Sequence, residues 1–264
     1  MRIALFQVAS PDEETPEDRR HRVQERLLSI ADDVDLIVLP ELWAAGYFTF
    51  PEYPERAEPL DGPTVAVARS VARQRRCWVH AGSLIEALPG GRMRNTAVLV
   101  GPSGQVAHTY SKIHVFGYRS LEAELLEPGR DISVTRTPFG GTTAVTCYDL
   151  RFPPLWSRLV DLGAELVVVP AAWPAARREH WRLLTAARAV DNQVFVVGCN
   201  ASGTHAGVEA GGTSRVVDPW GRTVAEAGDD EEVLVVTIDP GAVAATRSEF
   251  PVLNDHLADY ASLG

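Results

Sequence analysis

One order of strands, helices and a hairpin occurs twice along the chain, and this repeat restricts the possible folds strongly. Each copy is interpreted as strand, helix, strand, helix, strand and hairpin. The first copy has elements beginning at residues 3, 16, 36, 64, 78 and 95, and the second at 143, 154, 166, 178, 194 and 214. Both hairpin turns carry Pro at the first central position and Gly shortly after it, in Gly101–Gly104 and Asp218–Gly221.

Each copy would form a sheet covered by helices on one side. Two such sheets packed face to face bury both inner surfaces and give α-β-β-α layers. No low-complexity segment or long linker interrupts the 264 residues. We therefore predict an α/β fold, a four-layer α-β-β-α sandwich, formed by a single domain over residues 1–264.

Charge and apolar patterning exclude several kinds of partner. The net charge of −10 argues against nucleic acid, which requires a basic face, and gives no attraction to an anionic membrane surface. The longest apolar run, residues 166–176, contains two prolines and is too short to cross a bilayer. The N-terminus lacks the pattern of a signal peptide. The three cysteines form no recognisable disulfide framework, so we expect a cytoplasmic protein with reduced thiols.

Two reactive side chains follow predicted strands, where open α/β sheets commonly place ligands. Glu41 follows the strand 36–40, and Cys147 ends the apolar run 143–146 before a turn into a helix. Backbone N–H groups and the helix dipole at such a turn would lower the pKa of Cys147 from about 8.5. Taken alone, a carboxylate in the position of Glu41 is more often a helix cap or a satisfied surface group, and a lysine in the position of Lys112 is usually solvated. Cys77 and Cys199, each inside an apolar strand, are expected to be structural.

Familiar cofactor and metal motifs are absent from the sequence. It contains no GxGxxG, Walker loop, HExxH or GxSxG, and its seven histidines show no metal-ligand spacing. We therefore expect neither a metal nor an organic cofactor.

Three segments together resemble the nitrilase, or carbon–nitrogen hydrolase, superfamily. They are LPELWAAGY (39–47), YSKIHVFG (110–117) and CYDLRFPPLW (147–156), and further similarity extends over nearly the whole chain. The resemblance implies the nitrilase type of α-β-β-α sandwich. It also implies a homodimer or higher homo-oligomer with a two-fold interface, in which Thr246–Tyr260 would be an arm on the partner or a tail packed on its own subunit.

The resemblance also implies a role for each motif residue. Cys147 would be the nucleophile, and Glu41 would move protons between the thiol, the leaving ammonia and water. Lys112 and the backbone N–H of Tyr148 would stabilise the oxyanion. Glu122 would hold Lys112, although Glu124 and Glu127 are close enough in sequence to leave that assignment open.

The sequence around the nucleophile resembles that of small amidases rather than true nitrilases, which usually carry Cys-Trp-Glu. We expect hydrolysis of a small-molecule amide to a carboxylic acid and ammonia. A small apolar pocket favours short aliphatic amides, and its expected lining is Trp43, Tyr47, Tyr148, Ala172 and Trp173.

The main alternative substrate is the monoamide of a dicarboxylic acid, as in an omega-amidase. Its distal carboxylate would need a partner such as Arg151, Tyr118 or Arg119. For Arg151 the competing interpretation, which we favour, is a structural ion pair with Asp149 or a contact with a helix end. A nitrilase and a catalytically silent scaffold of the same fold are further alternatives.

Overall fold

The computed structural model describes residues 1–31 and 33–257, and most of its strands form two six-stranded sheets. The first sheet contains, in spatial order, β14 (Glu232–Thr237), β1 (Arg2–Gln7), β2 (Leu36–Val38), β3 (Trp78–Ala87), β4 (Met93–Val100) and β5 (Val106–Ser111). The second contains β13 (Thr223–Glu226), β12 (Arg215–Val217), β9 (Phe195–Asn200), β8 (Leu166–Ala171), β7 (Gly140–Ala144) and β6 (Thr135–Thr137). A separate hairpin joins β10 (Thr204–His205) to β11 (Val208–Glu209).

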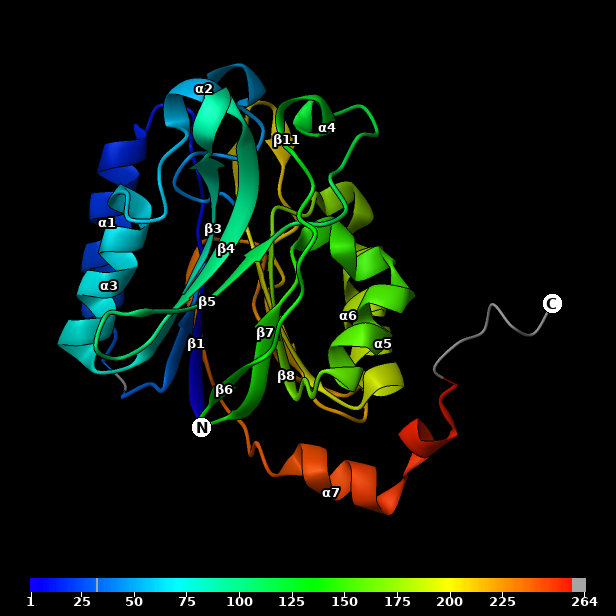
Figure 1. The fold of residues 1–264 in the computed structure, drawn as a ribbon. Helices are drawn as coiled ribbons and strands as arrows, with labels where there is room; N and C mark the ends of the chain where they lie inside the picture. The colour runs from blue at the N-terminus through cyan, green and yellow to red at the C-terminus, as the bar shows by residue number, and fades with distance from the viewer. Residues whose placement is uncertain (32, 258–264) are drawn as a thin grey trace.

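Helices cover the outer side of each sheet, so the layers follow the order α-β-β-α (Figure 1). The long helices are α1 (Pro16–Leu28) and α3 (Pro63–Arg75) on the first sheet, and α5 (Pro153–Asp161) and α6 (Arg178–Asn192) on the second. The shorter ones are α2 (Tyr53–Arg56), α4 (Glu122–Leu125) and α7 (Ala242–Glu249). The 3₁₀ helices are η1 (Phe50–Glu52), η2 (Pro89–Gly91), η3 (Cys147–Arg151), η4 (Ala175–Arg177) and η5 (Val252–Asp255). The predicted sandwich and its repeated element order are confirmed.

The repeat appears directly in the strand pairing. In the first sheet the strands β1, β2 and β3 are parallel, and β4 and β5 follow with antiparallel pairing. In the second sheet the strands β7, β8 and β9 are parallel, and β12 and β13 follow with antiparallel pairing. Each sheet gains one further antiparallel edge strand, β14 beside β1 and β6 beside β7. We did not predict these two strands, because neither belongs to the repeated unit.

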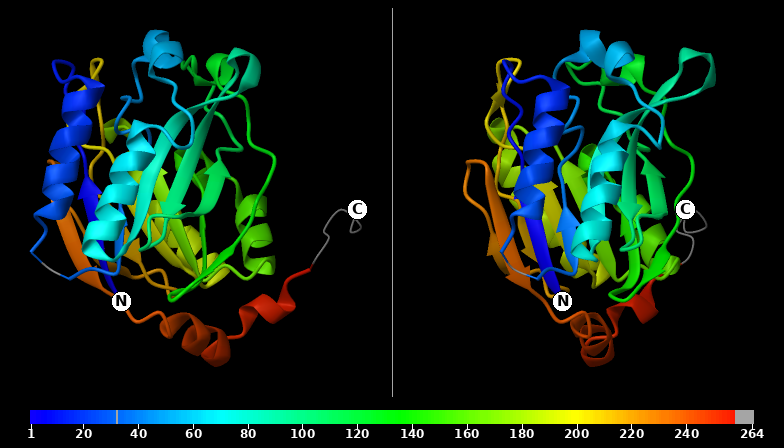
Figure 2. Two further views of the ribbon diagram at one scale, coloured as in Figure 1. Left: turned by 60° about the vertical axis from the view of Figure 1, so that its left-hand side comes forward. Right: turned by 90° about the vertical axis from the view of Figure 1, so that its left-hand side faces the viewer.

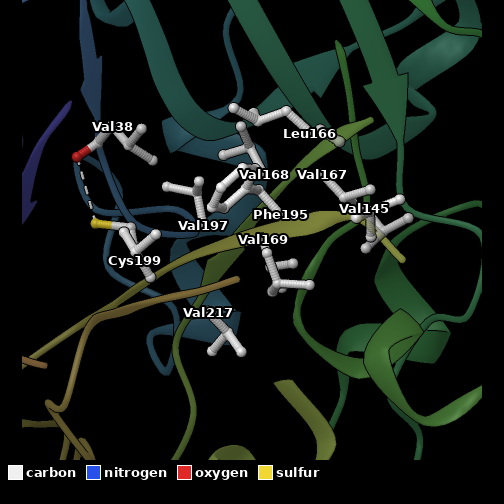
Figure 3. Packing of buried hydrophobic residues seen from close by; sticks show 14 of the residues in the cluster. Val38, Val145, Leu166, Val167, Val168, Val169, Phe195, Val197, Cys199 and Val217 are labelled. Atoms are coloured by element: carbon white, nitrogen blue, oxygen red, sulfur yellow. Dashed lines mark hydrogen bonds between the residues drawn. The ribbon is translucent and has the colours of Figure 1, made fainter. Parts of the chain in front are cut away.

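Apolar side chains from both sheets form the central core. Val38 of β2 faces Val168 and Val197 of the other sheet, and all three are fully buried (Figure 3). Removing this continuous apolar surface from water is the main stabilising term of such a fold. Cys199 belongs to the same core, and its thiol donates to the carbonyl of Val38 at 3.3 Å, so its structural role is confirmed (Figure 3).

The C-terminal segment leaves the sandwich through α7 and η5, close to the N-terminus (Figure 2). The Arg247 guanidinium donates to the carbonyl of Ala164 at 2.8 Å, and the Gln193 side chain donates to that of Phe250 at 2.7 Å. This part of the predicted arm therefore contacts its own subunit, while Tyr260 lies outside the described residues. Across residues 1–31 and 33–257, none of the helices has the length and apolar character needed to cross a bilayer.

Candidate active site

Glu41, Lys112 and Cys147 meet at the carboxyl edge of the two sheets. Glu41 follows β2, Lys112 follows β5 and Cys147 follows β7. All three are buried, with exposed fractions of 1%, 1% and 8%. The structure thus brings together three residues that are distant in sequence.

A bulge in β3 positions the segment that carries Glu41. At Gly82 the backbone has φ +67°, and an added Cβ would lie 1.9 Å from the carbonyl oxygen of Pro40, so only glycine fits this approach. Next to it, Ser83 accepts a hydrogen bond from the N–H of Leu42 at 3.1 Å. The turn at Glu41 is therefore held against the neighbouring strand.

Lys112 is held as a cation between two carboxylates. Its Nζ lies 2.8 Å from Glu41 Oε1 and 2.9 and 3.0 Å from the two oxygens of Glu122, and all three side chains are inaccessible to solvent. Burial by itself lowers the pKa of Lys112, but the carboxylates of Glu122 and Glu41 more than offset this and raise it above its usual value. Lys112 is also the only lysine in the sequence. A compact ammonium with three donors suits three carboxylate oxygens better than a planar guanidinium would.

The sequence left open whether Glu122, Glu124 or Glu127 supports Lys112, and Glu122 is the one that contacts it. It also accepts hydrogen bonds from the Tyr47 hydroxyl at 2.7 Å and the N–H of Phe116 at 3.0 Å. Glu124 is exposed, and Glu127 lies in a surface ion-pair cluster, 3.4 Å from Arg92. Only Glu122 therefore has the buried position that a support for Lys112 requires.

The carboxylate of Glu41 faces four partners. Oε1 accepts from Lys112 and, at 2.8 Å, from the side-chain amide of Asn95, while Oε2 accepts from the N–H of Ala172 at 3.0 Å. The thiol of Cys147 lies beside this carboxylate, whose charge raises the pKa of the thiol. Burial raises the pKa of Glu41, and the ammonium of Lys112 opposes this. Glu41 can therefore accept the thiol proton directly.

Cys147 has a strained backbone and a thiol whose pKa is raised. Its φ of +47° lies in the left-handed region, which costs roughly 1–2 kcal/mol for a residue with a Cβ. Burial, followed by the carboxylate of Glu41, raises the pKa of the thiol well above its ordinary range. Our expectation of a lowered pKa is wrong, because burial and the adjacent carboxylate outweigh the short η3 helix. A base must therefore remove the proton before the sulfur can attack.

A cavity of about 40 Å³ lies beside Cys147 and opens to solvent. Its lining includes the expected Tyr47, Tyr148, Arg151, Ala172 and Trp173, together with Phe48, Phe116, Pro174 and Arg177. Trp43 does not line it, contrary to our expectation. Its indole N–H donates to the carbonyl of Ala81 at 2.8 Å, and its side chain belongs to the apolar cluster between the first sheet and α3.

Two guanidinium groups form the polar part of this cavity. The Arg151 guanidinium lies 4.7 Å from the ring centroid of Trp173. The Arg177 guanidinium lies 5.7 Å from the ring centroid of Phe116. Among residues 1–31 and 33–257, no carboxylate lies within ion-pair distance of either group. Burial, and then the charge of Arg177, lower the pKa of Arg151. The cavity thus presents two positive charges that no carboxylate in the described chain neutralises.

The structure corrects our other expectations about the distal carboxylate. Arg151 does not pair with Asp149, which instead accepts hydrogen bonds from Tyr110 and His114. The Nη2 atom of Arg151 instead lies 3.2 Å from Nδ1 of His180. Tyr118 and Arg119 do not line the cavity, since they occupy an exposed loop where the guanidinium covers the Tyr118 ring.

Sequence reasoning missed Asn95, Asp149 and Arg177. A buried amide at the start of an otherwise apolar strand was the available signal for Asn95. Nothing local distinguishes Arg177 from the neighbouring arginines in AARREHW. In the described part of the chain, no cluster of three or more His, Cys, Asp or Glu side chains is arranged to hold a metal ion.

Comparisons with known proteins show the family to which the chain belongs. The sequence matches the carbon–nitrogen hydrolase family over residues 2–248. It is 41% identical to a 2-oxoglutaramate amidase from Paenarthrobacter nicotinovorans, over 97% of this chain and 90% of that protein. It is 34% identical to an omega-amidase from Danio rerio, over 86% of this chain and 84% of that protein.

A similar solved structure is a variant of the amidase from Nesterenkonia sp. AN1 with acrylamide added at its active site cysteine. The TM-score is 0.82 at 26% identity, over 96% of this chain and 98% of that one. The strand-end residues, the buried carboxylates and these matches lead to one assignment. The chain belongs to the carbon–nitrogen hydrolase family.

Proposed function

We propose that this protein is an amidase that hydrolyses the terminal amide of a small dicarboxylic acid monoamide, the omega-amidase reaction. The observation that carries the substrate class is the pair Arg151 and Arg177, whose charges face the cavity with no carboxylate partner among the residues that the structure describes. A guanidinium binds a carboxylate strongly, through charge-assisted hydrogen bonds. The names of the relatives in Paenarthrobacter and Danio support the same class. This reverses our preference for neutral aliphatic amides.

The proposed reaction proceeds through a thioester on Cys147. Glu41 accepts the thiol proton as the sulfur attacks the amide carbon, and the carbonyl π electrons move onto oxygen. When the tetrahedral species collapses, the C–N bond breaks and Glu41 returns the proton to the departing ammonia. Water then loses a proton to Glu41 and attacks the thioester. The C–S bond breaks to release the carboxylic acid, and Glu41 returns its proton to the sulfur, which regenerates the thiol. The acrylamide adduct on the cysteine of the Nesterenkonia amidase supports the assignment of the nucleophile.

We propose that Lys112 and the backbone N–H of Tyr148 stabilise the oxyanion of the tetrahedral species. Lys112 remains charged between Glu41 and Glu122, and Tyr148 follows the nucleophile at the start of η3. Each such donor contributes about 3 kcal/mol to transition-state stabilisation. Asn95 and Glu122 then hold Glu41 and Lys112 at fixed separation, and neither needs to contact the substrate.

Ammonia release from a panel of amides tests the proposal. Glutaramate, succinamate and their 2-oxo forms should be hydrolysed faster than acetamide, propionamide and butyramide, and Cys147→Ala should reduce every rate to background. Preference for the neutral amides would make the protein an aliphatic amidase. Consumption of the matching nitriles alone would make it a nitrilase, and no turnover with any compound would favour a silent scaffold.

Replacing Arg177 with Ala should weaken the binding of acid-bearing amides selectively. Loss of one charge-assisted contact costs about 1.5–3 kcal/mol, so KM for glutaramate should rise roughly 10- to 100-fold while that for butyramide changes little. Steady-state kinetics with both amides measures the effect. Arg119→Ala, which removes an exposed guanidinium outside the cavity, is the matched control. An equal change for both amides would exclude Arg177 as a carboxylate ligand.

We further propose that the protein is a cytoplasmic homodimer. The three cysteines are free thiols, as expected in a reducing compartment. Several exposed apolar side chains lie near the C-terminal segment: Trp220 stacks on Phe250 with ring centroids 6.2 Å apart, and Val190 adjoins the turn at Gly221. Sedimentation equilibrium should give twice the chain mass of 28.7 kDa. A monomer at micromolar concentration would exclude the dimer.

A further inference from the structure

Asp149, two residues after the nucleophile, is fully buried and accepts hydrogen bonds from four groups. Its Oδ2 accepts from the N–H of Thr146 at 3.1 Å and from the hydroxyl of Tyr110 at 2.7 Å. Its Oδ1 accepts from both the backbone N–H and the ring Nδ1 of His114, at 2.9 and 2.7 Å. Every one of these distances is within the range of a normal hydrogen bond.

The four donors belong to the two segments that carry the proposed nucleophile and oxyanion donor. Thr146 immediately precedes Cys147, while Tyr110 and His114 lie two residues before and two residues after Lys112. The Lys112 segment extends from β5 of the first sheet, and the Cys147 turn extends from β7 of the second. One carboxylate thus connects the ends of two strands from different sheets, directly beside the site.

The backbone at Cys147 requires such a constraint. A residue with φ +47° relaxes toward the ordinary regions unless the surrounding structure holds it. The bond from the N–H of Thr146 to Asp149 restrains the residue before Cys147, and the contacts with Tyr110 and His114 restrain the segment opposite. The His114 ring also stacks on Phe152, with centroids 3.6 Å apart and planes 6° apart, so the restraint extends to the residue after η3.

We propose that Asp149 is a positioning residue that sets the separation and direction of the Cys147 sulfur relative to the Lys112 ammonium. This inference rests on the proposed roles of Cys147 and Lys112. Asp149 contacts neither side chain and does not line the cavity, so it acts only through the backbone and neighbouring side chains of the two segments that carry them. It should therefore affect the chemical steps more than substrate binding.

The test is Asp149→Asn, which keeps the shape but replaces one acceptor oxygen by a donor facing N–H or O–H groups. We expect kcat to fall roughly 10- to 100-fold and KM to change less than about threefold, which indicates an interaction lost mainly in the transition state. Glu58→Gln is the matched control, because Glu58 is also buried and accepts from the N–H of Thr64 at 2.8 Å, away from the site. This control should leave kcat and KM unchanged.

Tyr110→Phe provides a milder second variant if Asp149→Asn does not fold. It removes one donor to Asp149, and we expect kcat to fall roughly three- to tenfold at constant KM. Thermal unfolding and active-site titration should show that each variant compared is folded. Unchanged kcat in a folded variant, or a rise in KM that accounts for the loss, would overturn the proposal. All variants are assayed with the amide that the wild type hydrolyses best. An error in the proposed substrate class would therefore show in the wild-type amide panel and would not affect the comparison of the variants.

Discussion

Replacing Lys112 with Met should abolish amide hydrolysis and lower the free energy of unfolding by about 3–5 kcal/mol. Lys112 Nζ lies within 3.0 Å of oxygens from both Glu41 and Glu122, and none of the three side chains reaches solvent. Methionine fills a similar volume but leaves the two buried carboxylates facing each other without a cation. Chemical denaturation measures the stability, and ammonia release measures the activity.

The stability of Lys112→Met should also depend on pH with a definite sign. Burial already raises the pKa of Glu41 while Lys112 is present, and removal of the ammonium raises it further. The folded variant then binds a proton that the unfolded chain releases above about pH 4.3. Since the folded state binds more protons, the free energy of unfolding should decrease from about pH 5 to about pH 8.

Addition of Glu122→Gln to Lys112→Met is the control for this interpretation. The second change removes one of the two facing charges, so it should recover a large part of the lost stability without restoring activity. If the single variant is as stable as the wild type, the carboxylates are not paired through Lys112. If the single variant stays active, Lys112 is not the oxyanion donor.

Glu41→Gln should lower kcat by roughly 10³- to 10⁴-fold with little change in KM. Glutamine keeps the size of the side chain and can still accept from the N–H of Ala172, but it cannot take the proton of Cys147. Steady-state kinetics with the best amide measures the loss. Glu86→Gln is the control, because Glu86 accepts from Thr96 in the same sheet but lies outside the cavity.

Alkylation of the cysteines by iodoacetamide separates a base-dependent thiol from a preformed thiolate. In the wild type Cys147 should react first, because it lines the cavity, whereas Cys77 and Cys199 are buried in the cores and burial raises the pKa of Cys77 to about 11. In Glu41→Gln, burial still raises the pKa of Cys147. Glutamine cannot accept the thiol proton, so labelling at about pH 7 should become slower even though loss of the Glu41 charge lowers the pKa of the thiol. The rate should still rise with pH near about pH 9. Fast labelling independent of pH would indicate a preformed thiolate.

Local sequence signals predicted the main elements because their causes are local. Thr15 caps α1 by accepting from the N–H of Asp18 at 3.1 Å, as the Thr-Pro pair indicated. Gly104 and Gly221 occupy turns with φ +84° and +78°, as the two hairpin turns indicated. The strand ends that carry Glu41 and Cys147 followed from apolar runs alone, and the family resemblance added their proposed roles.

The directions of the side chains and the pKa values of buried groups could not be predicted from local sequence signals. Trp43 and Tyr47 lie in one motif, yet only Tyr47 lines the cavity, because the indole of Trp43 is buried in the apolar cluster of the first sheet, α1 and α3. The raised pKa of Cys147 depends on burial by both sheets and on a carboxylate more than a hundred positions away. Asn95, Asp149 and Arg177 became visible only once the strands were paired. Periodicity and turn chemistry act over a few residues and therefore specify elements, whereas burial, ion pairing and cavity lining depend on segments that only the folded chain brings together.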